Sequence, residues 1–292
     1  MRRPFYRGTS DRTGSTFFFV YAPLFINCLV VVIGIYICSM EYYSNEEIPE
    51  ILYHYTSLET LFAILSGIFT EKSYVGDTSY FYMRATHASF LNDDKEGRLL
   101  PIALKELGEN EQKIALLDSL CGYPFVLSLS KLNDDLNMWR CYADNARGIC
   151  IGIKTNQLNE HEDIKKCEYI SIEELLDIFN TENVKDMIND NDVTNIARFL
   201  NQAFYYKDKT FIAEQEWRLF ITDLTDKFCY SNNKIIPYKE IKIPTSALYS
   251  ITTGPKCDYE KNIFSIRRLL KTKISGDELN RIKFLQSNVP LV

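Results

Sequence analysis

Two stretches far apart in the chain carry the residues best suited to chemistry. His54, one of three histidines in the sequence, is followed two and three positions later by the hydroxyl residues Thr56 and Ser57. Glu214 and Glu216 place two carboxylates one residue apart. Because side chains alternate along a strand, both carboxylates are expected on one face, where they can stabilise positive charge and bind hydroxyl groups. The spacing therefore predicts a polar site.

A structural interpretation of the same residues stays open. Arg218 continues the face of Glu214 and Glu216, so the three side chains can also form a surface ion-pair ladder, with Trp217 turned to the core. A histidine at the end of a strand can equally be packed and hydrogen-bonded without binding anything. His87, in a polar stretch, is a second candidate with the same alternative.

A third stretch holds Trp139 and Tyr142, which share one face of a short helix because they are three residues apart. Such a pair is typical of core packing. The acidic turn at residues 92–96 offers oxygen ligands for a cation, but capping of the following helix explains it with fewer assumptions.

The surrounding pattern predicts the elements that position these residues. Ser57 and Asp258 are expected to cap helices, and Asp134 or Asp135 a third. The predicted strands are Ile51–Tyr53, Tyr80–Arg84, Phe125–Ser130, Ile149–Ile153, Glu216–Leu219 and Leu248–Thr253. The predicted helices are Leu58–Ser66, a segment from about Asp93 to Leu107, a short helix through Trp139, Ile172–Asn180 and Val193–Tyr206 within a helical region 156–206, and Tyr259–Leu270. This mixture predicts one α+β domain over residues 48–290, with short, mainly antiparallel strands and flanking helices.

Composition narrows the class of protein. The chain has 292 residues, of which 46% are hydrophobic, enough for a sizeable core. Its net charge is −6, and residues 1–39 carry +3 from four arginines and one aspartate, which leaves −9 on residues 40–292. An acidic body argues against broad binding of a phosphate backbone. Eight cysteines without a Cys-x-x-Cys pair predict no metal site, and no P-loop, dinucleotide fingerprint or Gly-x-Ser-x-Gly elbow occurs.

The N-terminal part has two open interpretations. Residues 1–16 form a basic tail, and residues 17–40 form a hydrophobic segment long enough for a helix that crosses a bilayer. The protein would then be anchored in a membrane by a single pass. Alternatively, translation starts at Met40, the upstream residues are not native to the working protein, and the protein is cytoplasmic.

The motifs together resemble the bacterial family known as domain of unknown function 2971. The resemblance covers about residues 48–290, with Asp94 at a position where the family often has proline. The motifs that carry it, in order, are Leu52–Ser57, Leu91–Glu96, Leu127–Ser130, Met138–Asp144, Gly148–Gly152 and Glu214–Leu219.

The order of the motifs is also similar to that of ADP-ribosyltransferases, enzymes that use NAD as a substrate. That resemblance implies an ADP-ribosyltransferase-like fold in which His54 binds a hydroxyl of the nicotinamide ribose. Glu216 would be the catalytic glutamate, and Glu214 would position the acceptor. Either Tyr142 or the pair Ser128 and Ser130 would line the site that holds the nicotinamide. The residues expected to contact NAD are His54, Tyr55, Thr56, Ser128, Ser130, Trp139, Tyr142 and Arg218.

Two functions follow from these expectations. The first is an NAD-dependent ADP-ribosyltransferase-like enzyme, a toxin or phage-defence effector, whose acceptor is a protein, a nucleic acid or a small molecule. The second is a sensor module that binds a nucleotide or another ligand without turnover, attached to a membrane if the hydrophobic segment is retained. The enzyme requires His54 and Glu216 to converge on one sugar.

Overall fold

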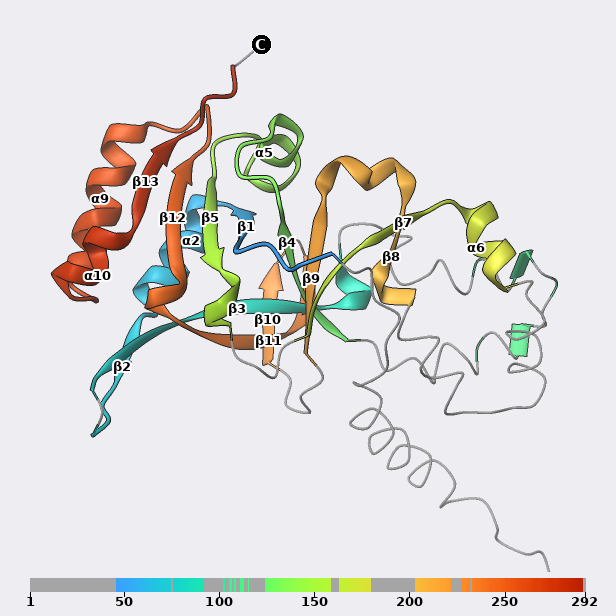
Figure 1. The fold of residues 1–292 in the computed structure, drawn as a ribbon, viewed down its shortest axis with the longest axis horizontal. Helices are drawn as coiled ribbons and strands as arrows, with labels where there is room; N and C mark the ends of the chain where they lie inside the picture. Colours follow the sequence, from blue (N-terminus) through green and yellow to red (C-terminus); the bar gives the residue numbers. More distant parts are fainter. Residues whose placement is uncertain are drawn as a thin grey trace, which may run out of the picture. The chain divides into compact units, whose positions relative to one another are not determined.

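The computed structural model describes residues 46–74, 76–91, 124–158, 163–179, 203–221, 227–231 and 233–290, with a few single positions between residues 102 and 115. These residues form a mixed α/β structure with a mainly antiparallel sheet and several helices (Figure 1). The expectation of α+β architecture with antiparallel strands is therefore confirmed at this level. The basic tail, the hydrophobic segment and, apart from a few single positions, the helix predicted from about Asp93 to Leu107 lie outside the described residues.

The large sheet runs in the order β10-β11-β3-β4-β1-β5-β12-β13, and β9 pairs with β4 and β6 beside this path. Within it only β12 and β13 are parallel. The bounds of its strands are β1 Ile51–Thr56, β2 Phe69–Glu71, β3 Thr78–His87, β4 Phe125–Ser130, β5 Ile149–Lys154, β6 Asp163–Lys166, β9 Glu216–Ile221, β10 Lys227–Ser231, β11 Lys234–Pro244, β12 Leu248–Thr253 and β13 Lys283–Gln286. Two shorter strands, β7 Glu168–Ile170 and β8 Tyr206–Asp208, pair in parallel by themselves.

One face of the sheet carries the main hydrophobic core. Helices α2 (Leu58–Ser66), α9 (Tyr259–Lys271) and α10 (Gly276–Arg281) pack there. Ser57 accepts a hydrogen bond from Thr60 N and Asp258 accepts one from Lys261 N, as expected of the two caps. The core also includes alternate residues of the strands, such as Leu52 and Ile151.

The opposite face of β1 packs against helix α5 (Leu136–Tyr142), which Asp135 caps by accepting hydrogen bonds from Asn137 N and Met138 N. Tyr55 and Trp139 meet edge to face, with ring centroids 4.9 Å apart, inside a separate hydrophobic cluster.

Residue Asp134 ties α5 to the C-terminal segment. Its Oδ1 accepts hydrogen bonds from Trp139 Nε1 at 2.6 Å and Ser287 Oγ at 2.6 Å, and its Oδ2 accepts one from Asn288 N at 2.8 Å. Val289 packs against the same hydrophobic cluster. The position of α5 therefore depends on residues about 150 positions later in the chain.

The prediction of helix throughout residues 156–206 is wrong. Within the described part of that region, α6 (Ile172–Phe179) is the expected helix, but β6, β7 and the start of β8 are strands. Residues Ala203–Tyr205 form a 3₁₀ turn, and the rest of the helix predicted from Val193 lies outside the described residues. None of the helices in the described ranges is both long and apolar enough to cross a bilayer.

Candidate functional site

The three chemistry-bearing stretches lie on, or directly beside, three adjacent strands. β4 pairs with β1 on one side through Tyr53 and Ser130, and with β9 on the other, where Ser130 faces Glu216 and Ser128 faces Arg218. The strand of the histidine, the Ser-x-Ser strand and the carboxylate strand therefore form a contiguous group. Helix α5 lies over the same side of the sheet as the carboxylates, since Tyr142 reaches Glu214.

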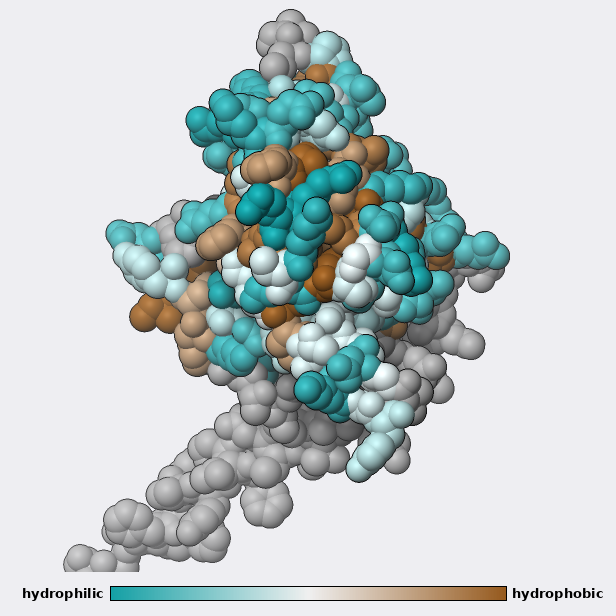
Figure 2. Space-filling view, turned by 90° about the vertical axis from the view of Figure 1, so that its left-hand side faces the viewer, coloured by the Kyte–Doolittle hydropathy of each residue, from teal (hydrophilic) through white to brown (hydrophobic). Residues whose placement is uncertain are grey.

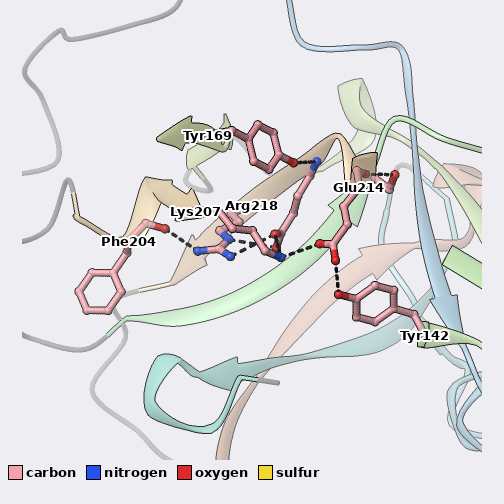
Figure 3. A network of polar contacts seen from close by, with 8 residues as sticks. Tyr142, Tyr169, Phe204, Lys207, Glu214 and Arg218 are labelled. Atoms are coloured by element: carbon pink, nitrogen blue, oxygen red, sulfur yellow. Dashed lines mark hydrogen bonds and ion pairs between the residues drawn. The ribbon is translucent and has the colours of Figure 1, made fainter. Parts of the chain in front are cut away.

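Glu216 lies at the centre of a buried charge network, whose members Lys207, Glu214 and Arg218 are labelled in Figure 3. Arg218 binds its carboxylate with two donors, Nε to Oε1 at 3.0 Å and Nη2 to Oε2 at 3.1 Å. Lys207 Nζ donates to Oε2 at 2.8 Å. The side chain of Glu216 is 6% exposed and that of Arg218 is fully buried. The alternative of a surface ladder is therefore wrong, although Trp217 does face the core as that alternative expected.

Glu214 reaches the network from a different element than predicted. It ends the 3₁₀ helix η4 (Lys209–Glu214), and Gln215 then adopts a left-handed conformation with φ of 44° before β9 begins. The alternation of a strand thus does not apply to Glu214. Its carboxylate instead accepts Tyr142 Oη at 2.5 Å on Oε1 and Lys207 Nζ at 2.6 Å on Oε2.

Lys207 links the two carboxylates and was not identified from the sequence. It comes from β8, and its side chain is 5% exposed. Its charge and that of Arg218 balance the charges of Glu214 and Glu216, which avoids two buried, unpaired carboxylates. This balance is the signal that could have identified it: two buried acids beside one arginine require a second cation.

His54 belongs to the other face of the sheet. Its backbone partner on β5 is Ile151 of the main core, whereas Tyr53 pairs with Ser130 on the side of Glu216. The ring donates from Nδ1 to the Ser128 carbonyl at 3.1 Å. Burial lowers the pKa of His54, so the ring is neutral near pH 7. His54 and Glu216 therefore lie on opposite faces of the sheet, and the structure does not bring the two side chains together at one surface.

Several other expected ligand contacts have structural partners. Tyr55 donates to Leu132 O and accepts from Asp135 N, and Trp139 is fully buried. Ser130 is buried, and its Oγ donates to Glu214 O at 2.7 Å while accepting from Leu132 N. Thr56 is 8% exposed at the end of β1. These side chains are thus held by contacts within the protein.

His87 is likewise separate from the carboxylate network. It ends β3, accepts a hydrogen bond from Ser89 N on Nδ1, and packs edge to face on Phe125. This arrangement agrees with the strand-turn interpretation of His87.

The accessible edge of the network lies at Glu214 and Tyr142. The Glu214 side chain is 14% exposed, more than the other three charged members, and Tyr142 is half-buried. Burial, and then the hydrogen bond to Glu214, raise the pKa of the Tyr142 hydroxyl, which stays protonated as a donor. Burial also raises the pKa of Glu216, and the charge of Lys207 opposes that rise. The arrangement can present a fixed carboxylate and an aromatic ring to a bound molecule.

A groove of about 510 Å³ lies elsewhere, between the β2–β3 hairpin and the α9–α10 connection. Its lining, which includes Thr70, Ser79, Lys271 and Ser275, shares no residue with the charge network. Figure 2 looks at the molecule from the side of β2, α9 and α10, where hydrophilic side chains predominate and hydrophobic residues are visible between them. The groove therefore gives no support to chemistry at Glu214 or Glu216.

Comparison with protein families matches part of the chain to one of unknown function. Residues 138–219 match the model described as "Protein of unknown function (DUF2971)". The matched range begins within α5 and ends within β9, so it contains Tyr142 and all four charged members of the network. The match supports the resemblance to this family, whose description names no activity. Searches of curated proteins and of solved structures gave no match.

Proposed function

We propose that this chain cleaves the bond between nicotinamide and ribose in NAD and transfers the ADP-ribosyl group, in the manner of ADP-ribosyltransferases. One observation carries the proposal: the carboxylate strand β9, the Ser-x-Ser strand β4 and the histidine strand β1 lie side by side. Residues that are distant in the sequence are thereby brought into contact. His54 bonds to Ser128 and Tyr142 bonds to Glu214, and each pair is more than 70 positions apart. The expected convergence of His54 and Glu216 on one sugar is not met, because the two side chains lie on opposite faces of the sheet, so the proposal rests on the adjacency of the strands and on the carboxylates rather than on the histidine.

The chemistry needs a negative charge beside the ribose. When the bond between C1′ and the nicotinamide nitrogen breaks, the electron pair leaves with nicotinamide, and positive charge develops on the ribosyl group. An acceptor oxygen or nitrogen then bonds to C1′ and gives up its proton, so that NAD and acceptor become ADP-ribosyl product, nicotinamide and a proton. A fixed carboxylate stabilises the intermediate charge. Glu214 and Glu216, held by Lys207 and Arg218, supply that carboxylate.

In this proposal Tyr142 contacts the substrate directly and His54 does not. Tyr142 stands beside Glu214 with a half-buried ring, which suits stacking on nicotinamide. His54 acts indirectly, because its ring donates to the Ser128 carbonyl on β4, the strand that pairs with the Glu216 strand β9. This differs from the direct ribose contact that the resemblance implied for the histidine.

The test is release of nicotinamide from NAD by the purified full chain, with water alone and then with protein and nucleic-acid acceptors. The wild type should release nicotinamide, and Glu214→Gln or Glu216→Gln should reduce the rate by about 100-fold or more while the protein stays folded. Glu174→Gln is the matched control, since Glu174 forms an exposed ion pair with Lys209. The proposal fails if wild type and both carboxylate variants are indistinguishable.

A second candidate is a sensor that binds the nucleotide without turnover. It is favoured by the charge balance of the network, in which two acids face two cations and every oxygen of Glu216 already has a donor. NAD would then raise the thermal midpoint. At a concentration 100 times the dissociation constant it would stabilise the folded chain by about 2.7 kcal/mol, and no nicotinamide would appear.

A further inference from the structure

We propose that Glu214, rather than Glu216, is the carboxylate that touches the substrate, and that Lys207 is the positioning residue that holds it in place. This inference rests on the proposed function and specifies how the site divides its work. It reverses the roles that the motif order implies for the two glutamates.

The carboxylate of Glu216 has little capacity left for a substrate. Three charged hydrogen bonds reach it from Arg218 and Lys207, between 2.8 and 3.1 Å. A carboxylate offers about four acceptor positions, so only about one remains, and both oxygens already face a cation. With its side chain 6% exposed, Glu216 is an internal anchor.

The carboxylate of Glu214 is only half used. It accepts one hydrogen bond on each oxygen, from Tyr142 and from Lys207, which leaves about two acceptor positions. It also lies at the accessible edge of the network, at the end of a 3₁₀ helix where the chain is not confined by strand pairing. A hydroxyl of a ribose ring can therefore bind Glu214 without breaking the network.

Lys207 fixes the distance between the two carboxylates. Its Nζ lies 2.6 Å from Glu214 Oε2 and 2.8 Å from Glu216 Oε2, and it also sits 4.9 Å from the centroid of the Phe211 ring. Without this charge, two neighbouring carboxylates repel and one of them takes up a proton at a higher pH than a lone glutamate does. Within the described residues, the other charged or titratable groups that face this pair are Tyr142 from α5, Arg218 from β9, Tyr169 from β7, and Cys167 between β6 and β7.

The experiment compares four variants of the full chain for nicotinamide release from NAD, with kcat and KM determined separately across pH 5 to 9. Glu214→Gln should fold with a lowered thermal midpoint, because Lys207 loses one of its two charged partners, and should lower kcat by about 100-fold, with KM changed less than about 3-fold. Lys207→Met should lower kcat and move the acidic limb of the pH profile upward by about one unit. Lys207→Arg should restore most of kcat, because it returns a cation to both carboxylates. Glu174→Gln should match the wild type.

Two results would overturn the inference while leaving the NAD activity in place. The first is a folded Glu214→Gln variant that retains the wild-type kcat. The second is an acidic limb that stays unchanged in Lys207→Met; if that variant does not fold, Lys207→Gln, which keeps a hydrogen-bond donor and removes the charge, serves the same comparison. Absence of nicotinamide release from the wild type itself would instead remove the proposed function, and this inference with it.

Discussion

Lys207 and Glu216 form a buried ion pair, with Nζ 2.8 Å from Oε2, although they come from different strands on either side of the 3₁₀ helix η4. This short connection brings Glu216 back beside Lys207, and it also places Glu214 against the same lysine. The acids and bases of the site are thus assembled by one compact turn of the backbone between β8 and β9.

Removing Arg218 should destabilise the protein strongly. Its side chain is fully buried and binds Glu216 and the Phe204 carbonyl, so Arg218→Met leaves a buried carboxylate with one cation fewer. The expected loss in the free energy of unfolding is about 3–5 kcal/mol. Urea denaturation measures it, and Lys209→Met, at an exposed pair, should cost less than about 1 kcal/mol.

The same ion pair predicts non-additive mutations. The double variant Arg218→Met with Glu216→Gln should lose less stability than the sum of the two single variants, because both charges leave together. Strict additivity would mean that the pair is not the interaction that stabilises this part of the sheet.

Tyr142→Phe separates the hydroxyl from the ring. The variant loses the hydrogen bond of 2.5 Å to Glu214, which should cost about 1–2 kcal/mol of stability because the acceptor is charged and the site is partly solvated. The KM for NAD should stay close to that of the wild type in Tyr142→Phe and rise in Tyr142→Ala, since stacking needs the ring. Equal KM values for both variants would contradict a ring that contacts nicotinamide.

Stability should fall on acidification in part because of His54. Burial lowers the pKa of the folded-state ring below its ordinary value of 6.5, so the folded state does not take up the proton that the unfolded chain accepts. The stabilising contribution is present above pH 6.5 and is lost as the pH falls below it, with a slope of at most about 1.4 kcal/mol per pH unit. His54→Gln should flatten this dependence in denaturation measured between pH 5 and 7, while its amide can still donate to the Ser128 carbonyl. An unchanged slope would show that another group is responsible.

Gly148 is required by close backbone approach. A Cβ at this position would lie 2.2 Å from the Thr56 carbonyl oxygen and 2.8 Å from the Ala143 carbonyl carbon, both of which are backbone atoms. Gly148→Ala should therefore cost about 3 kcal/mol or more. Gly276→Ala is the control, because a Cβ there meets nothing within 4 Å. Thermal melts of the two variants, compared with the wild type, measure the difference.

Local patterns in the sequence were sufficient for elements with clear boundaries. Ser57, Asp135 and Asp258 cap the helices that they were expected to cap, since each precedes an apolar helical repeat. The strands β4, β5 and β12 were predicted from their apolar runs. Residues 163–166 fall in the region 156–206, which was interpreted as helical and charged, yet Lys166 and its neighbours in β6 pair with β9. Pairing with a distant strand overrode the local pattern there.

The site was predictable as a set of residue types but not as an arrangement. Glu216 and Arg218 follow from strand alternation, whereas Glu214 reaches the same place through a left-handed residue, Gln215, which the alternation rule cannot anticipate. Lys207 carries no local signal because its role comes from tertiary charge balance. The face occupied by His54 depends on the pairing of β1 with both β4 and β5.

The attachment of Ser287 and Asn288 to Asp134 has a practical consequence. A protease that trims the chain just before Ser287, or a purification tag that pulls this segment away, would free the carboxylate that restrains the indole of Trp139. Recombinant preparations that differ only in the processing of their last few residues should therefore differ in the mobility of helix α5, which carries Tyr142, even where their overall folding is the same.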